Sequence, residues 1–256
     1  RRPAHRASGQ HFLRSKQLAA ALVAGAAVAP GDLVVEIGGG RGVITSELAR
    51  ARARVRVLER DPALAGVLRR RFDSNSAVEV VLADAREYVW PDEPFSVVAN
   101  LPFAGSGAIL ASLLRDPSLP LRRALVIVQW EFAAKHAAVW PATQRATYWR
   151  AWYDISIARR LDRTAFAPPP SVDTAVLRLE RRADPRVPTH LHEAYWRFLG
   201  AAFASQRPVR RGLRTVAPLK VKRLAPALGF GLTTLPRDLD AEQWARLFAA
   251  ASTNAK

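Results

Sequence analysis

The chain has 256 residues, close to half of them hydrophobic, which is enough to bury the core of one domain plus a smaller appendage. It contains no cysteine, and this excludes disulfides, thiolate nucleophiles and cysteine-based zinc sites. The formal net charge of +17 favours a polyanionic partner, nucleic acid first, over a small acidic metabolite. A basic surface that is merely solvated is the alternative.

The first part of the chain alternates predicted helices and strands. A helical repeat of Leu and Ala runs from Ser15 to Ala27 and is too short to cross a membrane, so we expect a cytoplasmic protein without membrane contact. The elements expected after it are, in chain order, a strand 33–37, a glycine loop 38–42, a helix 43–51, a strand 55–58, a helix 62–72, a strand 78–82, a strand 95–99, a helix 107–114 and a strand 124–128.

This alternation predicts an α/β fold with a doubly wound, Rossmann-like and mostly parallel sheet. In such sheets, ligands bind beyond the carboxyl ends of the strands. Gly38, Glu59, Asp84 and Asn100 each follow the end of a predicted strand. We therefore expect these four residues to meet at one edge of the sheet.

From Ala183 onward the pattern changes to short amphipathic helices broken by proline and glycine. This part carries 12 Lys and Arg against 5 Asp and Glu, so it is itself basic. We expect a sheet domain over 1–183 and a small, all-helical, basic domain over 184–256. Seven basic residues suit phosphate contacts, unless they form only a solvated face: Arg207, Arg210, Arg211, Arg214, Lys220, Lys222 and Arg223.

The glycine loop indicates which cofactor the sheet binds. Gly38 and Gly40 let the backbone approach a ligand closely, although a glycine turn that binds nothing is the alternative. The spacing is Gly-x-Gly-x-Gly rather than the Gly-x-Gly-x-x-Gly of dinucleotide sites, and Glu36 precedes it. A carboxylate there would repel a pyrophosphate and favour a nearby ammonium group. This predicts S-adenosylmethionine rather than NAD.

Two further acidic residues suit the rest of that cofactor. Glu59 lies at the distance after the glycines where a carboxylate accepts hydrogen bonds from ribose hydroxyls. Asp84 is interpreted in the same way, as an acceptor for the amine of the cofactor's adenine. Each can instead be a helix cap or a solvated turn residue.

The segment Asn100-Leu101-Pro102-Phe103 follows an apolar strand directly. The lone pair of an adenine amine is delocalised into the ring, so a methylating site must hold the amine with its lone pair turned toward the methyl donor. The side-chain carbonyl of Asn100 and the backbone carbonyl of Leu101 can each accept one amine hydrogen. Pro102 would fix the turn and Phe103 would stack on the base, with no metal required. A strand end followed by a stiff turn is the structural alternative.

Together these stretches resemble the ribosomal RNA adenine dimethyltransferases, which include the erythromycin-resistance (Erm) enzymes and the small-subunit dimethyladenosine transferases. The resemblance implies cofactor contacts by His11, Leu13, Gly38, Glu59, Asp84 and Asn100, with Phe103 and Phe166 holding a flipped adenine. His11 departs from the asparagine of many relatives. The matching stretches are 9–13 (GQHFL), 36–42 (EIGGGRG), Glu59, Asp84, 100–103 (NLPF), 129–133 (QWEFA) and 166–173 (FAPPPSVD).

Within the family, Trp130 and the aromatic run 148–153 resemble the actinobacterial Erm enzymes. This favours an adenine of 23S ribosomal RNA and implies resistance to macrolide, lincosamide and streptogramin B antibiotics. We expect a monomer. Three alternatives stay open: a housekeeping 16S dimethyladenosine transferase, an NAD-dependent dehydrogenase, and a non-catalytic RNA-binding or transcription-factor relative.

Overall fold

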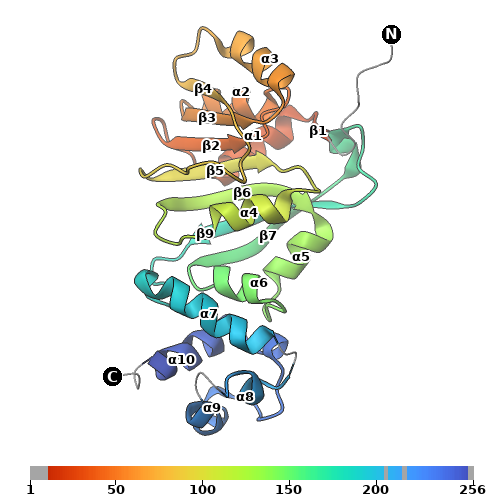
Figure 1. The fold of residues 1–256 in the computed structure, drawn as a ribbon. Coiled ribbons are helices and arrows are strands. Elements are labelled where there is room, and N and C mark those ends of the chain that lie inside the picture. The colour runs from red at the N-terminus through yellow and green to blue at the C-terminus, as the bar shows by residue number, and fades with distance from the viewer. Residues whose placement is uncertain (1–10, 205–206, 215–217, 253–256) are drawn as a thin grey trace. The chain divides into compact units, whose positions relative to one another are not determined.

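The computed structural model describes residues 11–204, 207–214 and 218–252. Seven strands form one sheet in the order β4-β3-β2-β5-β6-β9-β7, and a two-stranded sheet pairs β1 with β8 (Figure 1). The strands are β1 (Phe12–Leu13), β2 (Leu33–Ile37), β3 (Arg54–Glu59), β4 (Val78–Leu82), β5 (Phe95–Asn100), β6 (Leu121–Gln129), β7 (Tyr153–Leu161), β8 (Phe166–Ala167) and β9 (Thr174–Arg181).

The helices between and after these strands confirm an α/β, Rossmann-like fold. Those of the first half are α1 (Lys16–Gly25), α2 (Val43–Arg50), α3 (Pro62–Phe72), α4 (Ser106–Leu113), α5 (Trp130–Ala137) and α6 (Gln144–Trp149). Those of the second half are α7 (His192–Phe203), α8 (Val209–Gly212), α9 (Pro218–Leu224) and α10 (Ala241–Ser252), with short 3-10 turns 163–165, 189–191, 226–228 and 236–238.

Strand order positions the site. β4, β3, β2, β5 and β6 run parallel, and β2 pairs with β3 on one side and β5 on the other. Because the chain passes from β2 outward to β3 and β4 and then returns to β5, the strand order reverses between β2 and β5. Such a reversal opens a crevice at the carboxyl ends of the strands. Gly38 follows β2 and Asn100 ends β5, so both lie at this crevice.

The sequence did not predict β7 and β9. β9 pairs antiparallel with β6, so the sheet is mixed at this side. In β7, Tyr153 and Ile155 are buried while Asp154 and Ser156 are exposed, as expected for a strand at the edge of a sheet. Its later residues include two exposed arginines, which hide the apolar signal of a strand.

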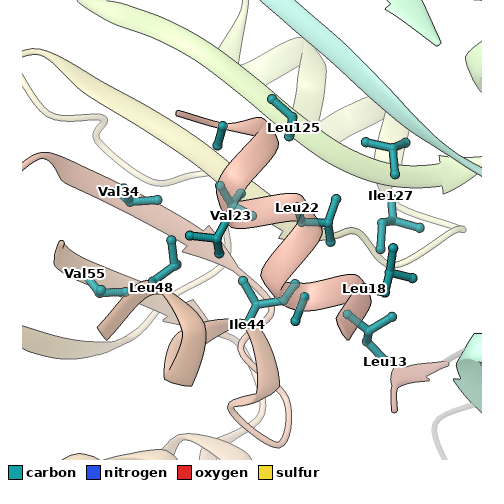
Figure 2. Close-up of a cluster of buried hydrophobic side chains, with 14 of the residues drawn as sticks. Leu13, Leu18, Leu22, Val23, Val34, Ile44, Leu48, Val55, Leu125 and Ile127 are labelled. Carbon is teal, nitrogen blue, oxygen red and sulfur yellow. The ribbon is translucent and has the colours of Figure 1, made fainter. Parts of the chain in front are cut away.

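Helix α1 packs on the sheet and contributes to a cluster of buried hydrophobic side chains (Figure 2). Ser15 caps the helix, because its hydroxyl oxygen accepts a hydrogen bond from the Leu18 backbone N–H at 3.1 Å. The buried side chains that meet here include Leu18, Leu22 and Val23 of α1, Val34, Leu125 and Ile127 of the sheet, and Ile44 and Leu48 of α2.

Gly39 is a structural residue of the glycine loop. A Cβ atom added there would stand 2.3 Å from Val57 Cγ1 and 2.9 Å from Leu68 Cδ1. We expect Gly39→Ala to lower the free energy of unfolding by about 1–3 kcal/mol through overpacking, as measured by urea unfolding. Gly66→Ala in α3, where the nearest atom is 3.6 Å away, should instead stabilise by up to about 1 kcal/mol. Equal stability of the two variants would contradict this packing argument.

The structure divides into two compact units. One comprises the described residues of Arg1–Arg115, Leu119–Ala133 and Ile157–Glu180; the other comprises those of Asp116–Ser118, Ala134–Ser156 and Arg181–Lys256. The second unit thus takes in 134–156 besides the C-terminal helices. The functional division into 1–183 and 184–256 stays a prediction.

The aromatic run of the sequence contributes to the core of the second unit. Tyr148, Trp149 and Trp152 are buried, and Trp152 packs against Tyr195 with ring centres 6.0 Å apart. Their role is therefore packing.

Candidate functional site

A cavity of about 350 Å³ opens at the carboxyl edge of the parallel strands. Its size falls within the range of small-molecule and cofactor sites. Of the residues singled out from the sequence, it is lined by His11, Gly38, Gly40, Glu59, Asp84, Asn100, Leu101, Pro102 and Phe103. The prediction that the four strand-end residues meet at one edge is confirmed.

Glu59 anchors the glycine loop to the end of β3. Its Oε2 accepts a hydrogen bond from the Gly40 backbone N–H at 3.0 Å, and its Oε1 accepts one from the Asp61 N–H at 2.9 Å. Each carboxylate oxygen has two lone pairs, so one remains on each oxygen for a further donor. The buried carboxylate can therefore hold the loop and still accept hydrogen bonds from two neighbouring hydroxyl groups.

The glycines at positions 38 and 40 shape the cavity wall. Gly38 has φ +74°, and a Cβ atom added there would meet only the Asn100 carbonyl oxygen, at 3.8 Å. Gly40 has φ +53°, and its Cβ would press against Phe12 at 3.0 Å. Left-handed backbone favours glycine, and a side chain at Gly38 would enter the crevice. The loop thus forms a cradle for a ligand.

Asp84 follows β4 and is ionised at neutral pH. Hydrogen bonds from the Arg86 side chain lower the pKa of Asp84 to about 2. Arg86 Nε donates to Oδ1 at 2.9 Å, and the Arg86 backbone N–H donates to the same oxygen at 2.9 Å. Asp84 thus also acts as the turn residue that was the alternative interpretation of its role. An amine donor at this end of the cavity would share the Asp84 carboxylate with Arg86.

Glu36 does not line the cavity. Its side chain is buried beside α2, where Thr45 Oγ1 donates to Oε2 at 2.6 Å. Burial, with a smaller contribution from the Glu59 charge, raises the pKa of Glu36 to about 8, so the carboxyl is protonated at pH 7. The expectation that the charge of Glu36 favours an ammonium group nearby therefore has no support in this geometry.

The buried proton of Glu36 has a measurable consequence. Between pH 4.5, the ordinary pKa, and pH 8, the folded chain holds a proton that the unfolded chain releases. Stability should therefore fall as the pH rises through this window, by up to about 1.4 kcal/mol per pH unit. In urea unfolding at pH 5 to 8, Glu36→Gln should lose this component, whereas Glu87→Gln at an exposed carboxyl should keep it. Parallel curves for wild type and Glu36→Gln would contradict the buried proton.

Asn100 carries an unused hydrogen-bond acceptor. Its Nδ2 donates to the His11 backbone carbonyl at 2.7 Å, which fixes the orientation of the amide. Its Oδ1 is buried and has no hydrogen-bond partner among the described residues. A buried carbonyl oxygen without a partner costs about 1–3 kcal/mol, so a donor entering the site gains this hydrogen bond.

His11 and Phe103 form an aromatic pair at the cavity wall. Their ring centres lie 5.2 Å apart with an interplanar angle of 25°. His11 Nδ1 also lies 2.8 Å from the Pro168 carbonyl oxygen, which ties β1 to the loop after β8. The pair presents stacked rings beside Asn100.

Two predicted contact residues, Leu13 and Phe166, lie elsewhere. Both are buried in the core cluster, and neither lines the cavity. They face each other in the β1–β8 pairing, where Leu13 is the partner of Phe166. The ring of Phe166 is completely buried in this arrangement, and the prediction that it holds a base stays a prediction. The two side chains support strand β1, which directly follows His11.

Sequence reasoning missed several residues of the cavity wall. Phe12, Arg60 and Arg86 also line the cavity. Each lies within two positions of a residue that was identified, which is the one signal that the sequence offered. Gly9 and Gln10 of the first matching stretch lie outside the described residues.

The basic residues of the C-terminal part that were predicted to contact RNA are exposed, as far as the structure describes their side chains. This holds for Arg207, Arg210, Arg211, Arg214, Lys222 and Arg223, whereas the side chain of Lys220 lies outside the described residues. Within the described ranges, no cluster of three His, Cys, Asp or Glu residues suits a metal ion, and no helix is long and apolar enough to span a membrane.

Comparison with known proteins gives a consistent result over nearly the whole chain. A family model described as ribosomal RNA adenine dimethylase matches residues 2–252. An rRNA adenine N-6-methyltransferase of Bacillus anthracis is 30% identical, and the match covers 94% of this chain and 85% of that protein. The mycinamicin-resistance protein MyrB of Micromonospora griseorubida is 31% identical, and the match covers 94% of this chain and 76% of that protein. The crystal structure of the 23S rRNA methyltransferase ErmE superimposes with a TM-score of 0.81 at 30% identity, covering 94% of this chain and 99% of that one.

Proposed function

Because the chain belongs to the ribosomal RNA adenine dimethylase family, we propose that it methylates the N6 amine of an adenine in 23S ribosomal RNA. The unpartnered Oδ1 of Asn100 is the observation that carries this proposal. It belongs to Asn100, a residue that lines the cavity next to a pair of stacked rings and whose amide is held in orientation by the His11 carbonyl. A site for the exocyclic amine of a flipped base requires such a hydrogen-bond acceptor for the amine and such aromatic rings for the base.

The cavity fits the methyl donor that the family implies. Gly38 and Gly40 supply the cradle, and Glu59 keeps a free lone pair on each oxygen for the ribose hydroxyls. Asp84 supplies an ionised acceptor for the adenine end. S-adenosylmethionine, when bound, provides the electrophilic methyl group.

The chain's own groups orient the acceptor amine. Oδ1 of Asn100 accepts one amine hydrogen, and the backbone carbonyl of Leu101 accepts the other, so the nitrogen lone pair is directed away from both oxygens. Phe103, backed by His11, stacks on the base and holds the ring plane. The rate gain then comes from positioning in a preorganised, water-poor site. No strong base is needed, because the methylated amine is acidic enough to lose its proton to water.

The large-subunit target and the resistance phenotype are supported by two relatives. ErmE is named as a 23S rRNA methyltransferase, and MyrB is named for mycinamicin resistance. Methylation at the macrolide-binding adenine places a substituent where the drug would bind. The chain, acting as a monomer, would thus protect the ribosome.

The test is transfer of radiolabelled methyl groups to protein-free 23S and 16S ribosomal RNA, offered separately. We expect label in the 23S RNA alone. Label in the 16S RNA alone would assign the chain to the small-subunit branch. RNA binding without label in either would contradict the catalytic proposal.

A further inference from the structure

Arg41 is an exposed cation inside the glycine loop. It lies between Gly40 and Gly42, and its guanidinium carbon stands 5.3 Å from the centre of the Phe12 ring. No carboxylate within the described ranges pairs with it. The aromatic ring holds the guanidinium in place without neutralising its charge.

Arg71, in the last turn of α3, is fixed beside the same loop. One of its nitrogens donates to the Arg41 carbonyl oxygen, and another donates to Ser46 Oγ at 3.0 Å. Its guanidinium carbon lies 5.4 Å from the centre of the Phe72 ring. Arg71, too, is exposed and forms no ion pair with any described carboxylate.

Some other arginines of this unit are neutralised by carboxylates. Arg54 pairs with Glu93 at 2.6 Å, and Arg56 pairs with Glu79 at 2.6 Å. Around Arg71 the sequence is dominated by cations, because Arg69 and Arg70 precede it and Asp73 is the nearest acid. The fold therefore maintains excess positive charge at the glycine loop, where a polyanion can bind.

This charge lies beside the wall of the cavity. The Phe12 ring under Arg41 is itself part of the cavity wall. An adenosine that flips into the cavity remains attached to the phosphates on both sides, which must stay near the rim. The ten residues before His11 also contain three arginines and no acid.

We infer that Arg41 and Arg71 bind backbone phosphates of the RNA strand that carries the target adenine. Guanidinium groups held by neutral partners keep N–H donors free for phosphate oxygens. The inference rests on the proposed function, and it places an RNA contact on the sheet domain besides the predicted C-terminal basic stretch.

The test measures affinity for a target-containing RNA fragment as a function of salt, for wild type, Arg41→Ala, Arg41→Glu and Arg41→Ala/Arg71→Ala. We expect the double variant to bind about 10-fold more weakly, with a log–log salt slope lower by about 1.5, because two phosphate contacts are lost. Arg41→Glu should weaken RNA binding at least as much as the double variant does. The backbone carbonyl of residue 41, to which Arg71 donates, remains in this variant. Arg54→Ala, which removes an ion-paired arginine, should change neither quantity.

Calorimetric titration with S-adenosylmethionine and thermal unfolding accompany each variant, so that a loss of RNA affinity through damage to the glycine loop or to the fold is recognised. A salt slope unchanged in the double variant, while wild type methylates the RNA, would overturn this inference alone. If wild type binds RNA but transfers no methyl group, the proposed function fails, whereas the phosphate contacts are still judged from the slopes.

Discussion

Replacing Asn100 with alanine should lower the turnover number for RNA methylation at least about 100-fold, while the dissociation constant for S-adenosylmethionine rises much less. The variant lacks the buried Oδ1 that we assign to the substrate amine, whereas Gly38, Gly40 and Glu59 of the cofactor cradle remain. Single-turnover methyl transfer and calorimetric titration of the cofactor measure the two quantities.

Asn75→Ala provides the matched control, because Asn75 Oδ1 accepts a hydrogen bond from Ala77 in a turn away from the cavity. Its turnover should equal that of wild type. If Asn100→Ala lost cofactor affinity and turnover by the same factor, Asn100 would act mainly on the cofactor and the assignment to the amine would be wrong.

The second large effect is expected at Glu59. Glu59→Gln keeps the side-chain volume, but it replaces two anionic acceptor oxygens by one neutral oxygen and an NH₂ group. One of the two backbone donors, from Gly40 or Asp61, must then lose its acceptor. We expect affinity for S-adenosylmethionine to fall roughly 100-fold, which corresponds to hydrogen bonds to a charged group of about 1.5–3 kcal/mol.

Glu79→Gln controls for the loss of one carboxylate, since Glu79 on β4 is exposed and bonded to Arg56. Its cofactor affinity should match that of wild type. Wild-type affinity in Glu59→Gln would show that Glu59 holds the loop alone and does not contact the cofactor.

The central strands of the fold were predictable, because strands buried on both faces appear in the sequence as short apolar runs between glycine and proline turns. β2 spans the five residues expected from Leu33 to Ile37. β7 was not predictable in this way, because one face is exposed and its second half carries Arg159 and Arg160. At a sheet edge, the partner strand decides the structure more than local composition does.

Sequence pattern located the site edge but not the direction of each side chain. Glu36 lies near the end of β2 and Gly38 follows that strand, yet the buried Glu36 side chain faces Thr45 of α2 while Gly38 lines the cavity. Phe166 follows a similar logic, since pairing of β8 with β1 turns its ring into the core. Spacing along the chain cannot distinguish these cases, because register and pairing partner set the direction.

The most direct measurement is the chemical identity of the product in 23S ribosomal RNA after incubation with the chain and S-adenosylmethionine. Nuclease digestion followed by chromatography and mass spectrometry should yield N6-methylated adenosine. The reaction with the Asn100→Ala variant should yield almost none of this product. A methyl group on a ring nitrogen or carbon, or on another nucleoside, would contradict the assignment of Asn100 Oδ1 to an adenine amine.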